Sequence, residues 1–189
     1  MTRQRPDAAQ RRRQLLDAAD EVFCQHGVLA PLELVIERAG LGRATLYRNF
    51  ADRAALMEAL LDRSLLALQA RARDLAAHPT GFFELLRDAA EHMAVSAALV
   101  DYWRTMARTH RVVTQAQART LAIFAPLLEV AIASGRCRAD LAQDDVALML
   151  NMLAGCLRGE TEAERRALAL RACELLGDAL VPAVMRQAT

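Results

Sequence analysis

The sequence contains few residues that interrupt a helix and few that favour a sheet. It has only 8 glycines and 5 prolines in 189 residues, and aromatic residues make up 4% of the chain. No stretch alternates β-branched and polar residues with the period of two that a half-buried strand requires. Hydrophobic residues nevertheless make up 54% of the chain, which is enough for a sizeable core. The composition therefore predicts an all-α protein.

Features typical of secreted, membrane and metal-binding proteins are also missing. The N-terminal stretch lacks the apolar centre of a signal peptide, and we find no uninterrupted apolar run of about 18 residues that could cross a membrane. Cys24, Cys137, Cys156 and Cys173 lie far apart and form no CxxC pair. We therefore expect a cytoplasmic protein with reduced thiols, no membrane partner, no metal and no other cofactor.

Lysine is absent, so all 24 basic residues are arginine, and 23 acidic residues nearly balance them. The formal net charge of +1 excludes a protein that is basic over its whole surface, so any nucleic-acid-binding surface must be local. The sequence also lacks HExxH, GxSxG, phosphate-loop and dinucleotide-binding motifs, and its 4 histidines are scattered. We therefore expect no catalytic residues and no enzymatic activity.

The spacing of apolar residues predicts a series of helices. An apolar stripe over residues 10–26 ends at Gly27, and two short helices follow, the second over about 43–49. Asp52 can cap a long helix that runs to about residue 77. After a break, further helices are expected at about 81–97, 101–111, 114–133, 143–158 and 161–184. We place an N-terminal domain at residues 1–55 and a C-terminal domain at residues 56–189.

The segment AGLGRATLYRNF, residues 39–50, has the pattern of the turn and second helix of a helix-turn-helix. Gly40 allows a sharp change of direction, while Leu46 and Phe50 are placed to face a core. The residues left near the outer face are Gly42, Arg43, Ala44, Thr45, Tyr47 and Arg48. A short helix with small residues early in it can enter the major groove of DNA.

These residue types suggest different roles on DNA. Arg43 can reach a guanine edge, and Thr45 can donate to a base or a phosphate. Tyr47 and Arg48 suit phosphate oxygens, which fix the register of a protein on DNA.

Further arginines flank this helix. Arg53, at the start of the next helix, is predicted to contact the DNA backbone from the side. A basic arm that follows phosphates or a minor groove is predicted from Arg3, Arg5, Arg11, Arg12 and Arg13.

Preceded by LLDAADEVFCQHGVLAPLELVIERAG, the segment GLGRATLYRNFADRAALMEAL resembles the N-terminal domain of the TetR family of transcriptional regulators. The resemblance runs from about Arg12 to Leu60 and includes Phe23, Gly27 and the tripeptide Thr45-Leu46-Tyr47. It implies about nine helices: a three-helix head, joined by a long helix to a body that binds a ligand and dimerises. It also implies a homodimer that binds a palindromic double-stranded DNA operator and releases it when a small molecule occupies the body.

The segment departs from the family pattern at a few positions. Ala30-Pro31 stands where Ser or Thr usually begins the second helix, which removes a hydroxyl that caps the helix and meets phosphate. Ile36, Ala44 and Asn49 replace a frequent Ala, Gly and His. None of these changes removes the motif.

Much of the scarce aromatic surface falls in the predicted helix 101–111. Trp103, Met106 and His110 share a face there, and Tyr102 is adjacent. We interpret this face as the wall of a pocket for an apolar ligand, with weaker candidates at Met93, Phe124 and Phe83. Ordinary core packing would give the same pattern. His92 follows Asp88 by four residues, a spacing that suits an exposed ion pair; a polar group in the ligand pocket is the alternative.

The predicted helix 143–158 is apolar on more than one side, and the last helix is similar. A surface helix needs only one apolar stripe, so the second stripe predicts a partner, most simply a second copy of the chain. The predicted interface residues are Leu148, Met152, Gly155, Cys156, Leu168, Ala172, Leu175, Leu176 and Ala179. Asn151 would then be a buried polar group that needs a partner, either its symmetry mate or a ligand.

Cys137, between Arg136 and Arg138, has two interpretations. Positive neighbours favour a reactive thiolate, which would suit a redox sensor. Alternatively, the side chain is an apolar residue that fills a loop.

Together these patterns predict a ligand-responsive transcriptional repressor that binds a palindromic operator as a homodimer. An activator or a ligand-indifferent regulator would use the same DNA-binding residues. An all-helical enzyme is a more remote alternative, and a helical dimerisation module that does not bind DNA is another.

Overall fold

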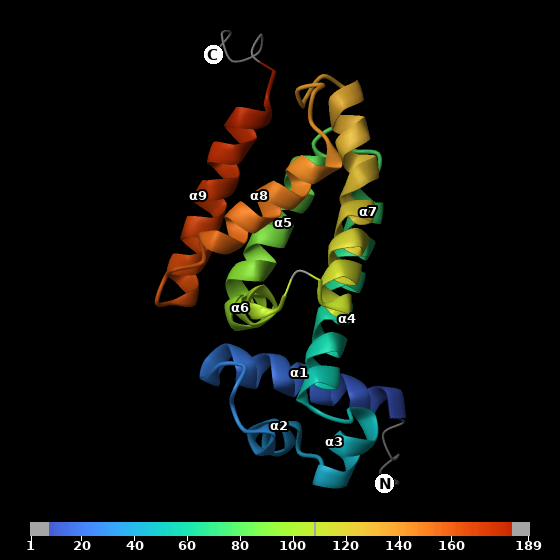
Figure 1. Cartoon of the computed structure of the whole chain (residues 1–189), viewed down its shortest axis with the longest axis vertical. Helices are drawn as coiled ribbons and strands as arrows, with labels where there is room; N and C mark the ends of the chain where they lie inside the picture. Colours follow the sequence, from blue (N-terminus) through green and yellow to red (C-terminus); the bar gives the residue numbers. More distant parts are fainter. Residues whose placement is uncertain (1–7, 108, 183–189) are drawn as a thin grey trace, which may run out of the picture.

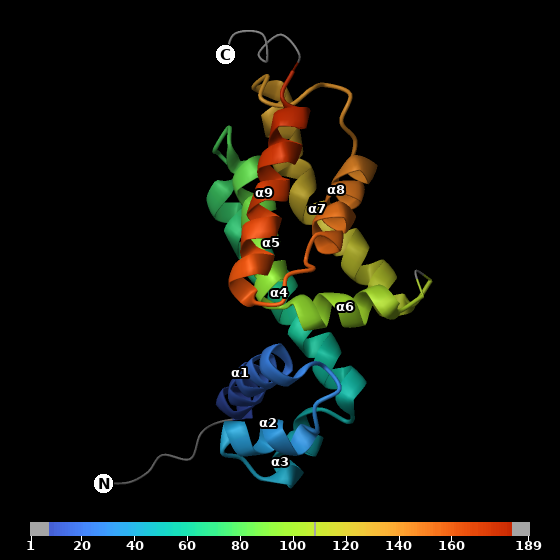
Figure 2. The same cartoon turned by 90° about the vertical axis from the view of Figure 1, so that its left-hand side faces the viewer.

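The computed structural model describes residues 8–107 and 109–182, which fold into nine helices and no strand (Figure 1). The helices are α1 (Ala8–His26), α2 (Leu32–Ala39), α3 (Arg43–Asn49), α4 (Arg53–Leu75), α5 (Gly81–Val95), α6 (Ala97–Thr105), α7 (Arg111–Ala133), α8 (Gln143–Gly155) and α9 (Glu162–Leu180). α1 to α3 form a head at one end, and α4 runs from it into a body of α5 to α9 (Figures 1 and 2). The predicted all-α fold, with its head, long connecting helix and helical body, is confirmed.

Every helix of the head contributes to one small core. Leu15 of α1, Val35 of α2 and Leu46 of α3 are buried together, and Leu56 and Leu60 of α4 join them. Full burial of each such side chain contributes roughly 1.5–3 kcal/mol. The head core therefore extends past residue 55 into the first turns of α4, so α4 is packed into the head at one end and into the body at the other.

The turn between α2 and α3 depends on Gly40. Its backbone lies in the left-handed region, with φ 63° and ψ 29°, which L side chains rarely adopt. The N–H groups of Gly40 and Leu41 donate to the carbonyls of Glu37 and Ile36 at 3.1 and 3.2 Å and close α2. This geometry lets the chain leave α2 at once and begin α3 after Gly42.

Two sets of contacts tie the head to the body. Arg63 of α4 donates to Asp17 and Asp20 of α1, each at 2.7 Å. At the other end of α1, the thiol of Cys24 donates to the Val95 carbonyl at 3.2 Å. α6 also packs on α1, and its Leu99 is buried in the head core. The head therefore contacts both α4 and the α5–α6 corner.

The body has its own core between α5, α7, α8 and α9. Phe82 of α5 and Phe124 of α7 are fully buried and meet edge to face, with ring centroids 6.0 Å apart. Leu153 of α8 and Ala169 of α9 are buried in the same core. This packing fixes the two C-terminal helices on one side of the body.

The sixth helix differs from the prediction of a helix over 101–111. α6 spans Ala97–Thr105, because Ser96 makes a tight corner at which α5 ends and α6 starts at once. α6 ends where Met106 takes an extended backbone, with φ −74° and ψ 148°. His110 precedes α7 as its N-cap residue, so Trp103 and His110 do not share a helical face, and that prediction was wrong.

By length and hydropathy alone, α7 is long and apolar enough to cross a membrane. The expectation from the sequence, which considered only uninterrupted apolar runs, did not include this helix. A core helix of a soluble protein can be as long and as apolar. α7 packs against α4, α5 and α8, and its Arg119 pairs with Asp62 of α4. We assign α7 to the helical body on these contacts.

Cys137 is buried in the body core, and this burial raises the pKa of its thiol to about 11. The neighbouring Arg138 points its Nε at Asp140, 2.7 Å away, so its charge has another partner. The loop-filling interpretation of Cys137 fits these contacts, whereas a thiolate favoured by its positive neighbours does not.

We predict that Cys137 reacts slowly with a thiol-specific reagent in the native protein at pH 8, because it is buried and protonated. Partial burial and the nearby Asp20 carboxylate also raise the pKa of Cys24, but its side chain is exposed, so it should give the faster phase of the reaction. Cys24→Ser should then remove that fast phase and Cys137→Ser should leave it unchanged. A fast phase that disappears in Cys137→Ser would refute this assignment.

Candidate nucleic-acid interface and effector cavity

α3 is positioned by one buried side chain and by the loop before it. Leu46 has 1% of its surface exposed and anchors the helix in the head core. Thr45 N–H donates to the Gly42 carbonyl at 2.8 Å, which starts the helix directly after the turn. Figure 1 shows α3 at the end of the head that is farthest from the body. The helix is therefore held firmly on one side and open on the other.

The outer side of α3 carries the donors that the sequence places there. Arg43, Ala44, Tyr47 and Arg48 are exposed, as is Gly42 before them, while Thr45 is half-buried. The sequence analysis predicted all six of these residues as DNA contacts, and the fold presents them together on one short helix and its cap. No residue of α3 is acidic, so its exposed face is basic.

Arg43 has two neighbours in the absence of DNA. One guanidinium nitrogen lies 3.6 Å from a carboxylate oxygen of Glu33 on α2, and the guanidinium lies 5.6 Å from the centre of the Tyr47 ring. Both residues of the ion pair are largely exposed, so the pair is weak and DNA can replace it. Arg48 donates to the Thr45 hydroxyl at 3.2 Å.

Arg12 joins the end of α3 to α1. Its guanidinium donates to the Asn49 carbonyl at 3.2 Å and lies over the Phe50 ring, 4.5 Å from its centre. Arg12 therefore lies beside α3, the helix predicted to read the DNA (the reading helix), as its own predicted DNA contact requires. Of the other arginines in the predicted arm, Arg3 and Arg5 lie outside the described residues.

Arg53 has a role that the sequence did not indicate. Its two terminal nitrogens donate to the carbonyls of Val28 and Ala30, at 2.5 and 2.7 Å, and its guanidinium packs over Phe23. These contacts hold the α1–α2 loop against the start of α4. A backbone contact on DNA by Arg53 stays a prediction.

We predict that Arg53→Leu lowers the free energy of unfolding by about 1–3 kcal/mol, because two carbonyls lose a charged donor. Chemical denaturation followed by circular dichroism measures this change. Arg13→Leu, on the exposed surface of α1, is the matched control and should change stability by less than about 0.5 kcal/mol. Equal stability of the two variants would refute the proposed role of Arg53.

The acidic residues of α1 have arginine partners away from α3. Asp17 and Asp20 bind Arg63, and Glu21 pairs with Arg38. These pairs partly neutralise the acidic residues of α1, and Glu33 of α2 is the acidic residue that lies next to Arg43 of α3.

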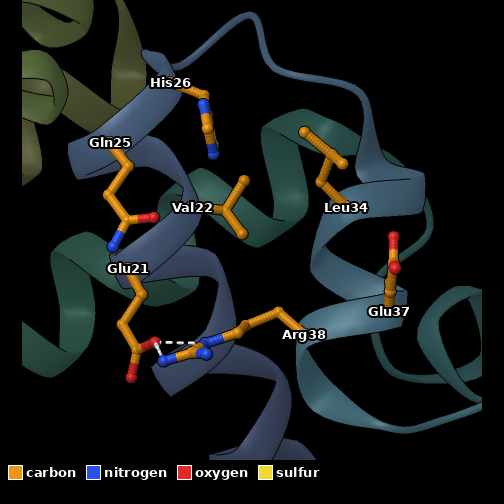
Figure 3. Close-up of a pocket in the computed structure, with 7 residues that line it drawn as sticks. All are labelled: Glu21, Val22, Gln25, His26, Leu34, Glu37 and Arg38. Atoms are coloured by element: carbon orange, nitrogen blue, oxygen red, sulfur yellow. Dashed lines mark hydrogen bonds and ion pairs between the residues drawn. The ribbon is translucent and has the colours of Figure 1, made fainter.

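A crevice of about 360 Å³ lies between α1 and α2 in the head. Figure 3 shows the Glu21–Arg38 ion pair at one end of it and His26 and Leu34 at the other. Five of the seven residues that line it are polar or charged, unlike the predominantly apolar wall of a typical small-molecule site. We assign it no ligand.

A larger cavity of about 780 Å³ lies in the body between α4, α5, α6, α7 and α8. Most of its wall is apolar, and its size lies within the usual range for small-molecule sites. Of the predicted ligand-binding residues, Trp103, Met106 and Met93 line it. Tyr102, His110, Phe83 and Phe124 are not part of the wall, and Phe124 is fully buried in the body core.

Of the polar part of the cavity, His92 and Asn151 were named from the sequence as alternatives, whereas Ser64 was not predicted. His92 of α5 and Ser64 of α4 both line it, with His92 Nε2 2.9 Å from Ser64 Oγ. Asp88, expected to pair with His92, instead accepts a hydrogen bond from Arg71 of α4 at 2.6 Å. Asn151 of α8 also lines the cavity and donates to the Ala147 carbonyl at 2.8 Å.

α8 and α9 lie next to each other on one side of the body (Figures 1 and 2). Leu148 and Met152 of α8 have 57% and 49% of their surface exposed, and Leu168 and Leu175 of α9 have 45% and 55%. Among the other predicted interface residues, Ala179 is exposed, and Gly155, Cys156, Ala172 and Leu176 are partly buried. Large apolar side chains exposed together are typical of protein interfaces.

Comparison with known proteins places this geometry in a family. The family model described as "Bacterial regulatory proteins, tetR family" matches residues 15–60, which include α2, α3 and the turn between them. No curated protein matches the chain at a significant level.

Solved structures are similar over nearly the whole chain. A TetR transcriptional regulator from Streptomyces coelicolor is 27% identical, with a TM-score of 0.70, over 91% of this chain and 99% of the other. A TetR transcription regulatory protein from Mycobacterium vanbaalenii is 26% identical, with a TM-score of 0.69, over 93% and 98% of the two chains. Both of these structures are of regulators of transcription. By the family match over residues 15–60 and by the fold of the whole chain, the protein has the helix-turn-helix head and the helical body of TetR-family transcriptional regulators.

Proposed function

We propose that the protein is a homodimeric repressor that binds a palindromic operator and releases it when a small molecule occupies the body cavity. The observation that carries this proposal is the combination of an exposed, acid-free reading helix with an apolar α8–α9 face on the same chain. The first supplies contacts to one half-site, and the second supplies a partner for the other half-site.

In the proposed dimer, α8 and α9 of one protomer pack against α8 and α9 of its partner about a two-fold axis. The two copies of α3 then enter successive major grooves on one side of the DNA, roughly 34–36 Å apart. Arg43 reads a base edge, while Tyr47 and Arg48 bind phosphates and fix the register.

Residues that line the cavity also contact the head, which supports release of the operator by a ligand. Leu99 and Trp103 of α6 line the cavity and also pack against the head core. Ser64 of α4 lines it too, directly after the Arg63 that binds α1. A ligand that favours a different position of α4 or α6 therefore changes the placement of the head. A coupling of roughly 1–3 kcal/mol changes operator affinity about 5- to 150-fold.

A reporter assay tests this function directly. DNA fragments bound by the purified protein are selected from the genome that encodes it, and the strongest is placed upstream of a reporter gene. We expect the protein to lower transcription from it, and a compound that fills the cavity to restore transcription. Increased transcription in the presence of the protein would instead identify an activator, and no response to any cavity-binding compound would identify a ligand-indifferent regulator.

A further inference from the structure

The charged side chains in the cavity wall have partners within the protein. Arg71 donates to Asp88 at 2.6 Å and also lies 3.6 Å from Glu84, while Arg104 pairs with Asp101 at 3.3 Å. An ionic ligand would lose its hydration here and would compete with these pairs for a partner. The cavity wall therefore favours a neutral ligand.

The hydrogen bonds of Ser64 determine which ring nitrogen of His92 carries the proton. Ser64 Oγ has a single hydrogen, and it donates to the Leu60 carbonyl, 3.2 Å away. With its hydrogen on the Leu60 carbonyl, Ser64 Oγ accepts at its second contact, and we assign the ring proton of His92 to Nε2, 2.9 Å away. This assignment selects one of the two tautomers of the neutral ring.

His92 Nδ1 is then a hydrogen-bond acceptor. Burial lowers the pKa of His92 from 6.5 despite the nearby carboxylate of Asp20, so the ring is neutral at neutral pH and Nδ1 keeps its lone pair. Within residues 8–107 and 109–182, Nδ1 has no hydrogen-bond partner, although the side chain is accessible and lines the cavity.

The other polar groups in the wall differ in what they offer, and Trp103 Nε1, which is buried without a partner, can only donate. The Thr120 hydroxyl, for example, donates to the Ala116 carbonyl at 2.8 Å, within its own helix. Around His92, Met93, Val100 and Leu121 supply apolar surface for the rest of a ligand.

We propose that the cavity binds a neutral, largely apolar molecule that carries a hydroxyl group, and that this hydroxyl donates to His92 Nδ1. The proposal rests on the function proposed above and names the chemical class of its effector. Ser64 acts as the positioning residue, because its hydroxyl holds the ring in the tautomer that accepts.

A matched pair of probes tests the hydrogen bond. 1-Decanol and nonyl methyl ether are isomers with the same number of heavy atoms, but only the alcohol can donate a hydrogen bond. Decanoate, an anion of the same chain length, tests the preference for a neutral ligand. Trp103 is the only tryptophan and lines the cavity, so its fluorescence reports binding to the full-length protein. We expect the alcohol to bind about 10-fold more tightly than the ether, near the upper end of what one net hydrogen bond provides. Decanoate should bind more weakly than the alcohol.

Three variants separate the hydrogen bond from cavity shape. His92→Phe should bind the alcohol and the ether equally, because a phenyl ring accepts no such bond. Ser64→Ala should narrow the difference, because the freed ring can turn a protonated nitrogen toward the ether oxygen. Thr120→Val is the matched control and should keep the full preference for the alcohol.

Equal binding of alcohol and ether to the unaltered protein, tighter binding of decanoate, or no binding of any probe would overturn the proposal. A preference for the alcohol that persists in both His92→Phe and Ser64→Ala would also overturn it. Operator binding by the ligand-free protein is measured on the same preparations and tests the proposed function separately. A repressor that binds its operator but ignores these probes would therefore refute only the assigned ligand class.

Discussion

Replacing Leu148 and Leu175 with arginine is expected to convert the dimer into a monomer and to lower operator affinity about 10²–10⁴-fold. Both side chains are more than half exposed on the α8–α9 face, where the proposed partner covers them. In the double variant, each interface would have to bury four unpaired guanidinium groups, which costs far more than the lost apolar contact. A monomer binds each half-site alone and loses the effective concentration that linking two heads provides.

Analytical ultracentrifugation gives the mass of the assembly, and fluorescence anisotropy with a labelled operator gives its affinity. Leu66→Arg is the matched control, because Leu66 on α4 has 58% of its surface exposed but lies outside the α8–α9 face. That variant should remain a dimer with unchanged operator affinity. A double variant that is still a dimer would show that the protomers meet elsewhere.

Arg43→Ala is expected to weaken operator binding by about 1–3 kcal/mol per half-site and to relax the preference for one base pair in each half-site. Arg43 is exposed at the start of the reading helix. Without DNA it pairs with Glu33, and this ion pair is weak because both side chains are exposed to solvent. Anisotropy titrations against operators substituted at single positions would show the relaxed preference as a loss of discrimination at one symmetric pair of positions.

Tyr47→Ala is the contrasting variant. Because a phosphate contact carries no sequence information, this change should weaken all of the operators by a similar factor and leave their ranking intact. If Arg43→Ala preserves the ranking in the same way, Arg43 is not a base-reading residue.

The sequence predicted best the features that depend on neighbours in the chain. The turn at Gly40, the inward Leu46 and the outward Arg43 and Tyr47 follow from residue type and helical spacing over a dozen residues. The exposed leucines of α8 and α9 were also predicted, because an excess of apolar residues around one helix is visible in the sequence.

Contacts between distant segments could not be predicted in this way. The DNA contact predicted for Arg53 stays a prediction, but its hydrogen bonds to carbonyls more than twenty residues earlier in the chain were not predicted. The expected His92–Asp88 pair failed for the same reason, since Arg71 and Ser64 come from another helix. The cavity residues were partly misplaced because α6 begins at the Ser96 corner, which local propensity did not identify.

The coupling of body to head depends on such tertiary contacts. Arg63 and Ser64 are adjacent on α4, yet one binds α1 and the other binds the histidine of the cavity. A ligand at His92 therefore contacts the residue that bonds Ser64, and Ser64 is next in the chain to Arg63, whose ion pairs hold the head. This proximity gives the proposed release a physical basis that helix order alone does not provide.

Selection of the purified protein against fully randomised DNA duplexes tests the central claim most directly. We predict enrichment of a palindrome whose half-sites are centred about one helical turn apart. Selection with Arg43→Ala should lose information at one symmetric pair of positions within that palindrome. Failure of the unaltered protein to enrich any sequence, or enrichment of a site without two-fold symmetry, would contradict a dimer that reads DNA through two copies of α3.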